Sequence, residues 1–287
     1  MKPARVIVTR PAQDAQRWVQ WLQQTGADAE ALTLIDIAPL AGAADSSALQ
    51  RAWRALPGYA ACLFVSGHAV EHFFKEKTTF TQEGRAKYAI HNVASQAFGS
   101  IPAKLRFMAP GPGTVTALRL AGIAAAQIDA PPPDAGQFDS QALWQVIGQR
   151  DWRGQRVLIV RGQSAGADGG SPGRDWIARQ WLAAGAIVDF VAVYQRRAPV
   201  LSQAELERAR AASADGSVWL FSSSEAIANL LGLGGLQQTN WSGALAIATH
   251  ARIAQTARTA GWGVVVESRP ALQDIRQALD SIELRHP

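Results

Sequence analysis

The sequence predicts an α/β protein with two similar parallel-sheet domains flanked by helices. Short runs rich in β-branched residues alternate with amphipathic helical segments along the 287 residues, and this order restarts near position 155. The stretch LFVSGHAVEHFF (63–74) also shares its pattern with FSSSEAIANLL (221–231), with Ser66 matching Ser223. Parallel strands require crossover helices that pack back onto the sheet, so two rounds of alternation indicate two related α/β units.

The first round begins with RVIVTR (5–10), which is typical of a strand. The next segment, 12–26, places Ala15, Trp18 and Leu22 on one helical face and ends at a glycine. This pattern predicts an amphipathic helix with a glycine stop. The remaining elements of this round are expected in the order strand, strand, helix, strand, helix, at 31–37, 61–65, 69–74, 105–110 and 114–122.

A proline-rich segment, IDAPPPDAGQFDS (128–140), is predicted to be a loop, because three successive prolines can neither donate to a strand ladder nor continue a helix. The second round follows it. Its strands are expected at 155–162, 186–194, 217–223, 244–249 and 262–268, and its helices at 173–185, 224–231, 250–261 and 270–282.

Composition narrows the function classes. The net charge of +5 is spread along the chain without a basic run, which favours an anionic small ligand over a nucleic-acid tail. No apolar run approaches the roughly 18 residues of a membrane span, and the first residues lack the pattern of a secretory signal, so we expect a cytoplasmic protein. The single cysteine, Cys62, lies in an apolar run and is expected to be a buried hydrophobe.

Hydroxyl side chains recur where predicted strands turn into helices. Ligands of open parallel sheets bind beyond the carboxyl ends of the strands, where helix N-termini present free N–H groups. Ser66, Thr114, Ser223 and Thr249 are all expected at such turns. Each could serve only as an N-cap, but four in equivalent turns favour an anion-binding cleft.

Two other motifs are weaker. GPGTVTA (111–117) resembles a dinucleotide fingerprint, but threonine replaces its third glycine, and Asp129 and Asp134 are expected beside the proline loop and not at a strand end. His68 and His72 are four residues apart without a third metal ligand nearby, so a solvated helix face is the preferred interpretation. These motifs indicate neither NAD binding nor a metal site.

Blocks of sequence in a fixed order carry a family resemblance. They are VTRP (8–11), FVSGHAV (64–70), GPGT (111–114), FDSQAL (138–143), VLIVRG (157–162), VAVYQRRAP (191–199), FSSSEAI (221–227) and IATHARIAQTARTAG (247–261). Over nearly its full length the chain resembles the uroporphyrinogen-III synthase family.

The resemblance implies a particular domain organisation. The first domain would combine residues 1–36 with 199–287, and the second would comprise 37–198. Two antiparallel linker strands would lie near 34–40 and 191–197. The substrate would bind in the cleft between the domains, a common place for a ligand pocket.

The resemblance also implies a reaction. The family cyclises hydroxymethylbilane to uroporphyrinogen III, with loss of water and inversion of ring D through a spiro intermediate, and neither a cofactor nor a metal is expected. The substrate can expel its hydroxyl and close unaided, but it then gives the type I isomer. The enzyme therefore works mainly by holding the carboxylates, stabilising the cationic azafulvene and favouring the spiro route.

Site residues follow from the resemblance. It implies Tyr194 as the catalytic residue, since a phenol can donate a proton or hydrogen bond to the departing hydroxyl. A tyrosine that packs at a strand end with its hydroxyl in water is the alternative. The implied substrate-binding residues are Arg10, Ser66, Gly67, His68, Gly113, Thr114, Arg161, Arg174, Ser223, Ser224, Thr249 and His250. The turn HARIA (250–254) departs from the threonine-containing turn of some relatives.

The implied partners are few. The chain would act as a monomer on a small-molecule substrate, with transient contact to hydroxymethylbilane synthase and no contact with nucleic acid or membrane. A rival interpretation is a non-catalytic two-domain sensor that closes on an anionic metabolite. Turnover of the substrate distinguishes the two.

Overall fold

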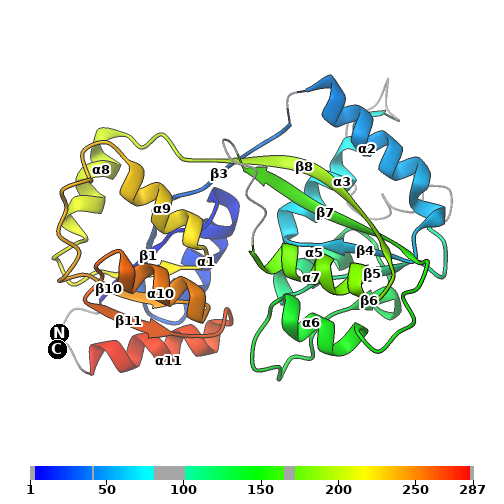
Figure 1. Cartoon of the computed structure of the whole chain (residues 1–287). Coiled ribbons are helices and arrows are strands. Elements are labelled where there is room, and N and C mark those ends of the chain that lie inside the picture. Colours follow the sequence, from blue (N-terminus) through cyan, green and yellow to red (C-terminus); the bar gives the residue numbers. More distant parts are fainter. Residues whose placement is uncertain (1–3, 41, 81–100, 165–171, 285–287) are drawn as a thin grey trace. The chain divides into compact units, whose positions relative to one another are not determined.

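The computed structural model describes residues 4–40, 42–80, 101–164 and 172–284, which fall in two compact units (Figure 1). Unit 1 comprises Met1–Ile37 with Arg197–Pro287, and unit 2 comprises Ala38–Arg196. The chain passes between them in β3 (Asp36–Ala38) and at the end of β8 (Ile187–Arg197), which are hydrogen-bonded neighbours in one sheet.

Unit 1 contains a five-stranded parallel sheet. Its strands are β1 (Arg5–Val8), β2 (Asp28–Ala31), β9 (Val218–Phe221), β10 (Leu245–Ala248) and β11 (Val264–Glu267). Its helices are α1 (Ala12–Gln24), α8 (Gln203–Ala211), α9 (Ser224–Gly232), α10 (Ala251–Thr259) and α11 (Leu272–Glu283). The strand order is β11–β10–β9–β1–β2, and all neighbours are parallel.

Both faces of this sheet are buried, which explains why its central strands are continuously apolar. In β1, Val6 and Val8 pack with the buried side chains of α1 and α11, whereas Ile7 packs with those of α9 and α10. Helix α1 turns Trp18 and Leu22 toward the first of these faces, as its periodicity predicts.

Unit 2 contains a six-stranded sheet. Besides β3 and β8, its strands are β4 (Ala61–Phe64), β5 (Arg106–Met108), β6 (Ile128–Asp129) and β7 (Arg156–Ser164). Its helices are α2 (Ala43–Ala55), α3 (Gly67–Phe80), α5 (Pro112–Leu120), α6 (Ser140–Ile147) and α7 (Pro172–Ala183), with 3₁₀ turns η1 (Leu56–Gly58) and η2 (Ala125–Gln127). The order is β3–β8–β7–β4–β5–β6, and strands β4 to β8 run parallel.

The two faces of the unit 2 sheet differ in packing. One face packs against α6 and α7, where Trp181 is fully buried and meets the rings of Trp144 and Trp152 edge to face. The other face carries an aromatic group in which Phe64 of β4 contacts Phe73 of α3, and Phe73 stacks on Trp53 of α2. Helices therefore cover both sides, as the fold class requires.

Asp129 is the last residue of β6, so the expectation that it would not stand at a strand end was wrong. Its side chain is only 7% exposed and accepts paired hydrogen bonds from Arg106 and Arg150, at 2.6 to 3.0 Å. Both carboxylate oxygens are engaged by guanidinium groups. This ion pair network leaves Asp129 committed to structure, which argues against the role of a ribose ligand in a dinucleotide site.

Asp129→Asn is expected to lower the free energy of unfolding by about 2 kcal/mol at neutral pH. Burial raises the pKa of Asp129, but hydrogen bonds from Arg150 and Arg106 outweigh it and leave the pKa below its ordinary value of 3.8. A depressed pKa stabilises the folded state above the unfolded value and loses this effect as the pH falls through the folded value. In urea titrations, the gap between wild type and variant should therefore narrow below about pH 4.

A matched control is Asp151→Asn, because Asp151 pairs with Arg153 on an exposed surface. That variant should unfold close to wild type at every pH. A gap for Asp129→Asn that stays constant down to about pH 2 would contradict the assigned ion pairs.

Candidate functional site

The strand order of each sheet reverses at one point. In unit 1 the chain builds outward from β1 to β2 on one side and from β9 to β11 on the other; in unit 2 it builds from β4 to β6 and from β7 to β8. Open α/β sheets bind ligands beyond the carboxyl ends of the strands at such a reversal. Arg10 follows β1 and Ser223 follows β9, while Ser66 follows β4 next to β7. Predicted site residues thus flank both reversal points.

Tyr194 and Ser66 form the centre of the candidate site in unit 2. The phenol oxygen of Tyr194 lies 3.1 Å from Oγ of Ser66, and either atom can be the donor. Ser66 also caps α3, because its Oγ accepts a hydrogen bond of 3.1 Å from the backbone N–H of Ala69. Tyr194 is only 3% exposed. The phenol is therefore held by a protein partner, in contrast to the alternative of a hydroxyl in water.

Two histidines of α3 lie against the Tyr194 ring. The ring centroids of His72 and His68 are 5.5 and 6.1 Å from that of Tyr194. His68 is 9% exposed, and its Nδ1 lies 3.3 Å from a carboxylate oxygen of Glu71. The preference for a solvated helix face was thus wrong for His68, because the first turn of α3 faces β7 and β8.

His72, which was expected on a solvated helix face and not among the site residues, also belongs to this cluster. Burial lowers its pKa, the charges of His68 and Lys75 act in the same direction, and Glu71 opposes them. The neutral imidazole is therefore favoured beside the phenol. The spacing of four residues from His68 was the available signal, since it places both rings on one helical face.

Gly67, Gly113 and Thr114 lie in the first turns of α3 and α5. A Cβ atom on Gly67 would be 3.8 Å from the carbonyl oxygen of Gly113, so the two helix starts are adjacent. Thr114 was predicted to stand at the turn before the helix, but it is the third residue of α5, where it is 6% exposed. The cap position belongs to Gly111.

The structure describes the side chain of only one of the two predicted arginines of unit 2. The guanidinium of Arg161 lies over the ring of Phe190, 4.7 Å from its centroid. Because consecutive strand residues point to opposite faces, Arg161 points away from the face on which Gly162 meets Tyr194. Arg174 lies in the first turn of α7, with its side chain outside the described residues.

Unit 1 presents a second row of polar groups beyond β9 and β10. Ser223 caps α9 by accepting from the N–H of Glu225 at 3.1 Å, and Ser224 accepts from the hydroxyl of Thr256 at the same distance. His250, rather than Thr249, caps α10, through its Nδ1 and the N–H of Arg252. Thr249 is 6% exposed and sits one residue before the cap.

Arg10 follows β1 with its guanidinium over the ring of Trp18, 4.6 Å from the centroid. Its Nε is buried and has no hydrogen-bond partner among the described residues. Burial lowers the pKa of Arg10 from 12.5 to about 10, with Asp14 opposing the shift and Arg17 adding to it. Arg10 is therefore still a cation at neutral pH, with a donor available to an anion.

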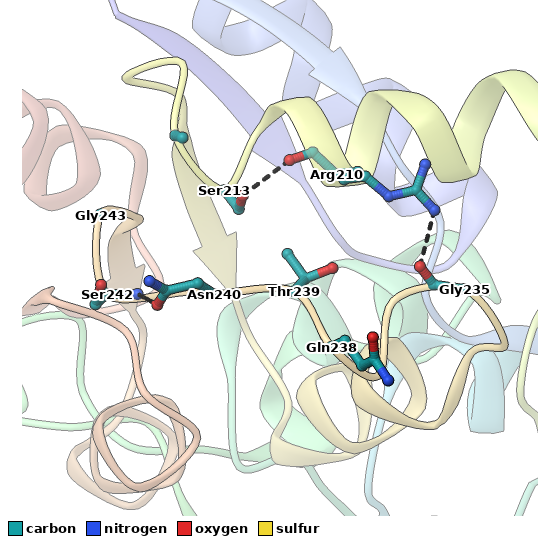
Figure 2. Close-up of a pocket in the computed structure, with 9 residues that line it drawn as sticks. Arg210, Ser213, Gly235, Gln238, Thr239, Asn240, Ser242 and Gly243 are labelled. Carbon is teal, nitrogen blue, oxygen red and sulfur yellow. Dashed lines mark hydrogen bonds between the residues drawn. The ribbon is translucent and has the colours of Figure 1, made fainter.

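A hollow of about 590 Å³ lies elsewhere in unit 1 (Figure 2). It is bordered by Arg210 and Ser213 at the end of α8 and by the loop 235–243 before β10. Figure 2 shows Arg210 bonded to the carbonyl of Gly235 and Ser213 bonded to the carbonyl of Arg210. These residues precede β9 and β10, at the edge opposite Arg10 and Ser223, so the hollow is separate from the candidate site.

Within the described ranges, no group of three or more His, Cys, Asp or Glu side chains has the arrangement of a metal site. In the same residues, every helix is too short or too polar to cross a bilayer.

The fold and its polar groups define a two-unit parallel α/β protein with candidate binding groups at the carboxyl edge of each sheet. A family model described as uroporphyrinogen-III synthase HemD matches residues 16–277. The chain belongs to the uroporphyrinogen-III synthase family, whose enzymes are hydro-lyases of porphyrin and haem biosynthesis.

A solved structure shares the fold. The chain resembles a mutant uroporphyrinogen III synthase of the extremely thermophilic bacterium Thermus thermophilus with a TM-score of 0.58 and 12% identity, over 99% of this chain and 100% of that chain. A uroporphyrinogen-III synthetase of Helicobacter pylori has a TM-score of 0.48 and 11% identity, over 97% and 99% of the two chains. No curated protein matches the chain significantly.

Proposed function

We propose that the chain cyclises hydroxymethylbilane to uroporphyrinogen III, with loss of water and inversion of ring D through a spiro intermediate. The hydrogen-bonded pair of Tyr194 and Ser66 at the strand reversal of unit 2 carries the proposal. The reaction conserves oxidation state and releases only water, so its chemistry calls for no redox cofactor.

The hydrogen-bonding capacity of Ser66 suggests how the hydroxyl departs. A serine hydroxyl has one hydrogen and two acceptor lone pairs. With Tyr194 as donor, Ser66 accepts from Tyr194 and from the N–H of Ala69, and its own hydrogen is left for a third group. We assign that hydrogen to the hydroxyl of the substrate. The hydroxyl then leaves as water, Ser66 regains a proton from Tyr194, and the phenolate is reprotonated by the proton that ring closure releases.

Substrate carboxylates need donors that are ready before binding. We propose that the helix starts of α3 and α5 supply N–H groups in unit 2, and that Arg10 with the starts of α9 and α10 does so in unit 1. Such donors bind the carboxylates of hydroxymethylbilane and so restrict the conformations in which it closes. Restriction of this kind favours the spiro route over direct closure.

Arg10→Gln is expected to raise KM for hydroxymethylbilane roughly tenfold, because a charge-assisted hydrogen bond to a substrate carboxylate is lost. The turnover number should change less, since the contact is equally present in ground and transition states. Arg17→Gln is the matched control, because Arg17 is exposed on α1 and paired with Asp14. Equal KM values for the two variants would remove Arg10 from the proposed site.

The decisive test supplies purified protein with hydroxymethylbilane generated in situ and separates the oxidised porphyrins by isomer. Predominantly type III product, without added cofactor, is the expected result. Type I at the rate of the buffer control would contradict the proposal and favour a non-catalytic sensor of an anionic metabolite.

We also propose that the chain acts as a monomer in the cytoplasm and receives hydroxymethylbilane in transient contact with hydroxymethylbilane synthase. Sedimentation of the purified protein tests the first point. Faster type III formation in the presence of active synthase than with an equal supply of free substrate tests the second.

A further inference from the structure

Gly162 is a buried residue of β7 that pairs with Tyr194 of β8. A Cβ atom built on Gly162 would lie 2.3 Å from Cε2, 2.4 Å from Cζ and 2.8 Å from the hydroxyl oxygen of Tyr194. The phenol ring therefore occupies the volume that any side chain at position 162 would need. We infer that Gly162 is a positioning residue, whose bare backbone lets the Tyr194 hydroxyl reach Ser66. This inference rests on the proposed role of Tyr194.

An irregularity in strand pairing produces this contact. Arg161 pairs with Ala192, whereas the next residue, Gly162, pairs with Tyr194, so Val193 is an extra residue in β8. A β-bulge of this kind re-aims the side chains that follow it. Here it brings Tyr194 opposite a residue of β7 that has no side chain to displace it.

Helix α3 also contacts the Tyr194 ring. The imidazoles of His72 and His68 lie at centroid distances of 5.5 and 6.1 Å, and both belong to α3. Helix α3 is in turn fixed at its start by Ser66, which bonds to the N–H of Ala69. A ring displaced by a side chain at position 162 must therefore disturb these contacts, and we expect the displacement to separate its hydroxyl from Ser66.

Backbone conformation does not explain the glycine. Gly162 lies in extended structure within β7, unlike glycines such as Gly26, whose φ of +86° requires the left-handed region. A glycine inside a strand weakens it and commonly marks close approach of another group. At Gly162 that group is the phenol of Tyr194.

Gly162→Ala is expected to slow type III formation roughly tenfold or more, as expected for Tyr194→Phe, and to raise the share of type I product. In a Tyr194→Ala background the same substitution should cause no further loss of rate or of thermal stability, because the ring it displaces is gone. Gly58→Ala is the control: Gly58 is exposed in the same unit, and a Cβ there meets nothing within 4 Å.

A spectroscopic readout separates positioning from general damage. The chain has three tyrosines, so protein labelled with ¹³C in its tyrosine rings gives few signals, and Tyr194→Phe assigns one of them. Gly162→Ala should shift the Tyr194 ring signals and leave those of Tyr59, whose hydroxyl bonds to Asp189 at 2.9 Å, unchanged. Gly58→Ala should shift neither.

The outcomes distinguish this inference from the proposed function. Two results would overturn the inference alone. One is unshifted Tyr194 signals in Gly162→Ala, and the other is a rate loss from Gly162→Ala that is equal in the wild-type and Tyr194→Ala backgrounds. Slow turnover in Tyr194→Phe with wild-type turnover in Gly162→Ala would also overturn it and leave the role of Tyr194 intact. Wild-type turnover in Tyr194→Phe would contradict both the proposed role of Tyr194 and the inference about Gly162. If Gly162→Ala fails to fold, the double variant must fold as well as Tyr194→Ala, and its failure to do so contradicts the inference.

Discussion

Tyr194→Phe is expected to slow the formation of uroporphyrinogen III roughly tenfold or more, a modest share of the effect of a general acid. The variant keeps the ring and the cap bond between Ser66 and Ala69, so α3 should begin unchanged. It removes only the hydroxyl that can return a proton to Ser66. The share of type I product should rise with the slower enzymatic route, because unassisted closure competes with it. Single-turnover kinetics with isomer analysis measure both effects.

Tyr59→Phe provides the matched control for this substitution. Tyr59 also lies in unit 2, where it precedes β4 while Ser66 follows that strand, and its hydroxyl donates to Asp189 at 2.9 Å. Burial, with the hydrogen bond to Asp189, raises the pKa of Tyr59 to about 12. Its loss should leave turnover and isomer ratio unchanged. Wild-type rate with clean type III product in Tyr194→Phe would refute the catalytic role.

Trp181→Ala is expected to lower the free energy of unfolding by about 3 to 5 kcal/mol, because it opens a large cavity in a closely packed core. Trp181 is fully buried between α7 and the sheet of unit 2, where Trp144 and Trp152 pack edge to face against it. Removing it therefore also removes two aromatic contacts. Urea unfolding followed by circular dichroism measures the change.

A second substitution at this position tests the reason for the loss. Trp181→Phe should cost only about 1 to 2 kcal/mol, since an aromatic ring remains and the lost indole N–H has no hydrogen-bond partner among the described residues. Trp21→Ala, at a tryptophan 43% exposed on α1, should cost less than about 1 kcal/mol. Similar losses for Trp181→Ala and Trp21→Ala would contradict the assignment of Trp181 to the core.

Periodicity predicted most of the alternation of strands and helices, because the helical and strand periods are local properties of the chain. It did not predict α2, α6 and α8, and the single strand expected at 31–37 is divided between the ends of β2 and β3. The helix predicted over 12–26 is α1, whereas the first two residues of the loop predicted over 128–140 form the short strand β6 and its last residue begins α6. The exact capping residue was less accessible. Thr114 lies three residues after the cap of α5 and Thr249 lies one residue before the cap of α10, because Gly111 and His250 occupy the two cap positions.

The candidate site could be predicted only in part. Tyr194 of β8 and Ser66, which follows β4, are 128 residues apart. No pattern in the sequence indicates that only β7 lies between these two strands in the sheet. The family resemblance supplied Tyr194, whereas the contact with Ser66 required the structure. The close approach of another group to Gly162 could have been predicted, because a glycine inside an apolar strand commonly marks such a contact. Its partner was hidden by the bulge, which moves the pairing by one residue.

The backbone N–H of Ala4 donates a hydrogen bond of 3.2 Å to the carboxylate of Glu283, which joins the residue before β1 to the last residue of α11. Unit 1 is assembled from two separate stretches of chain, whereas unit 2 is a single stretch. A circular permutant that connects the ends by a short linker and opens near residue 197 would therefore encode unit 1 without interruption, followed by unit 2. The interrupted order of unit 1 in this chain would become a tandem order of the two units, and each unit could be expressed as one continuous polypeptide.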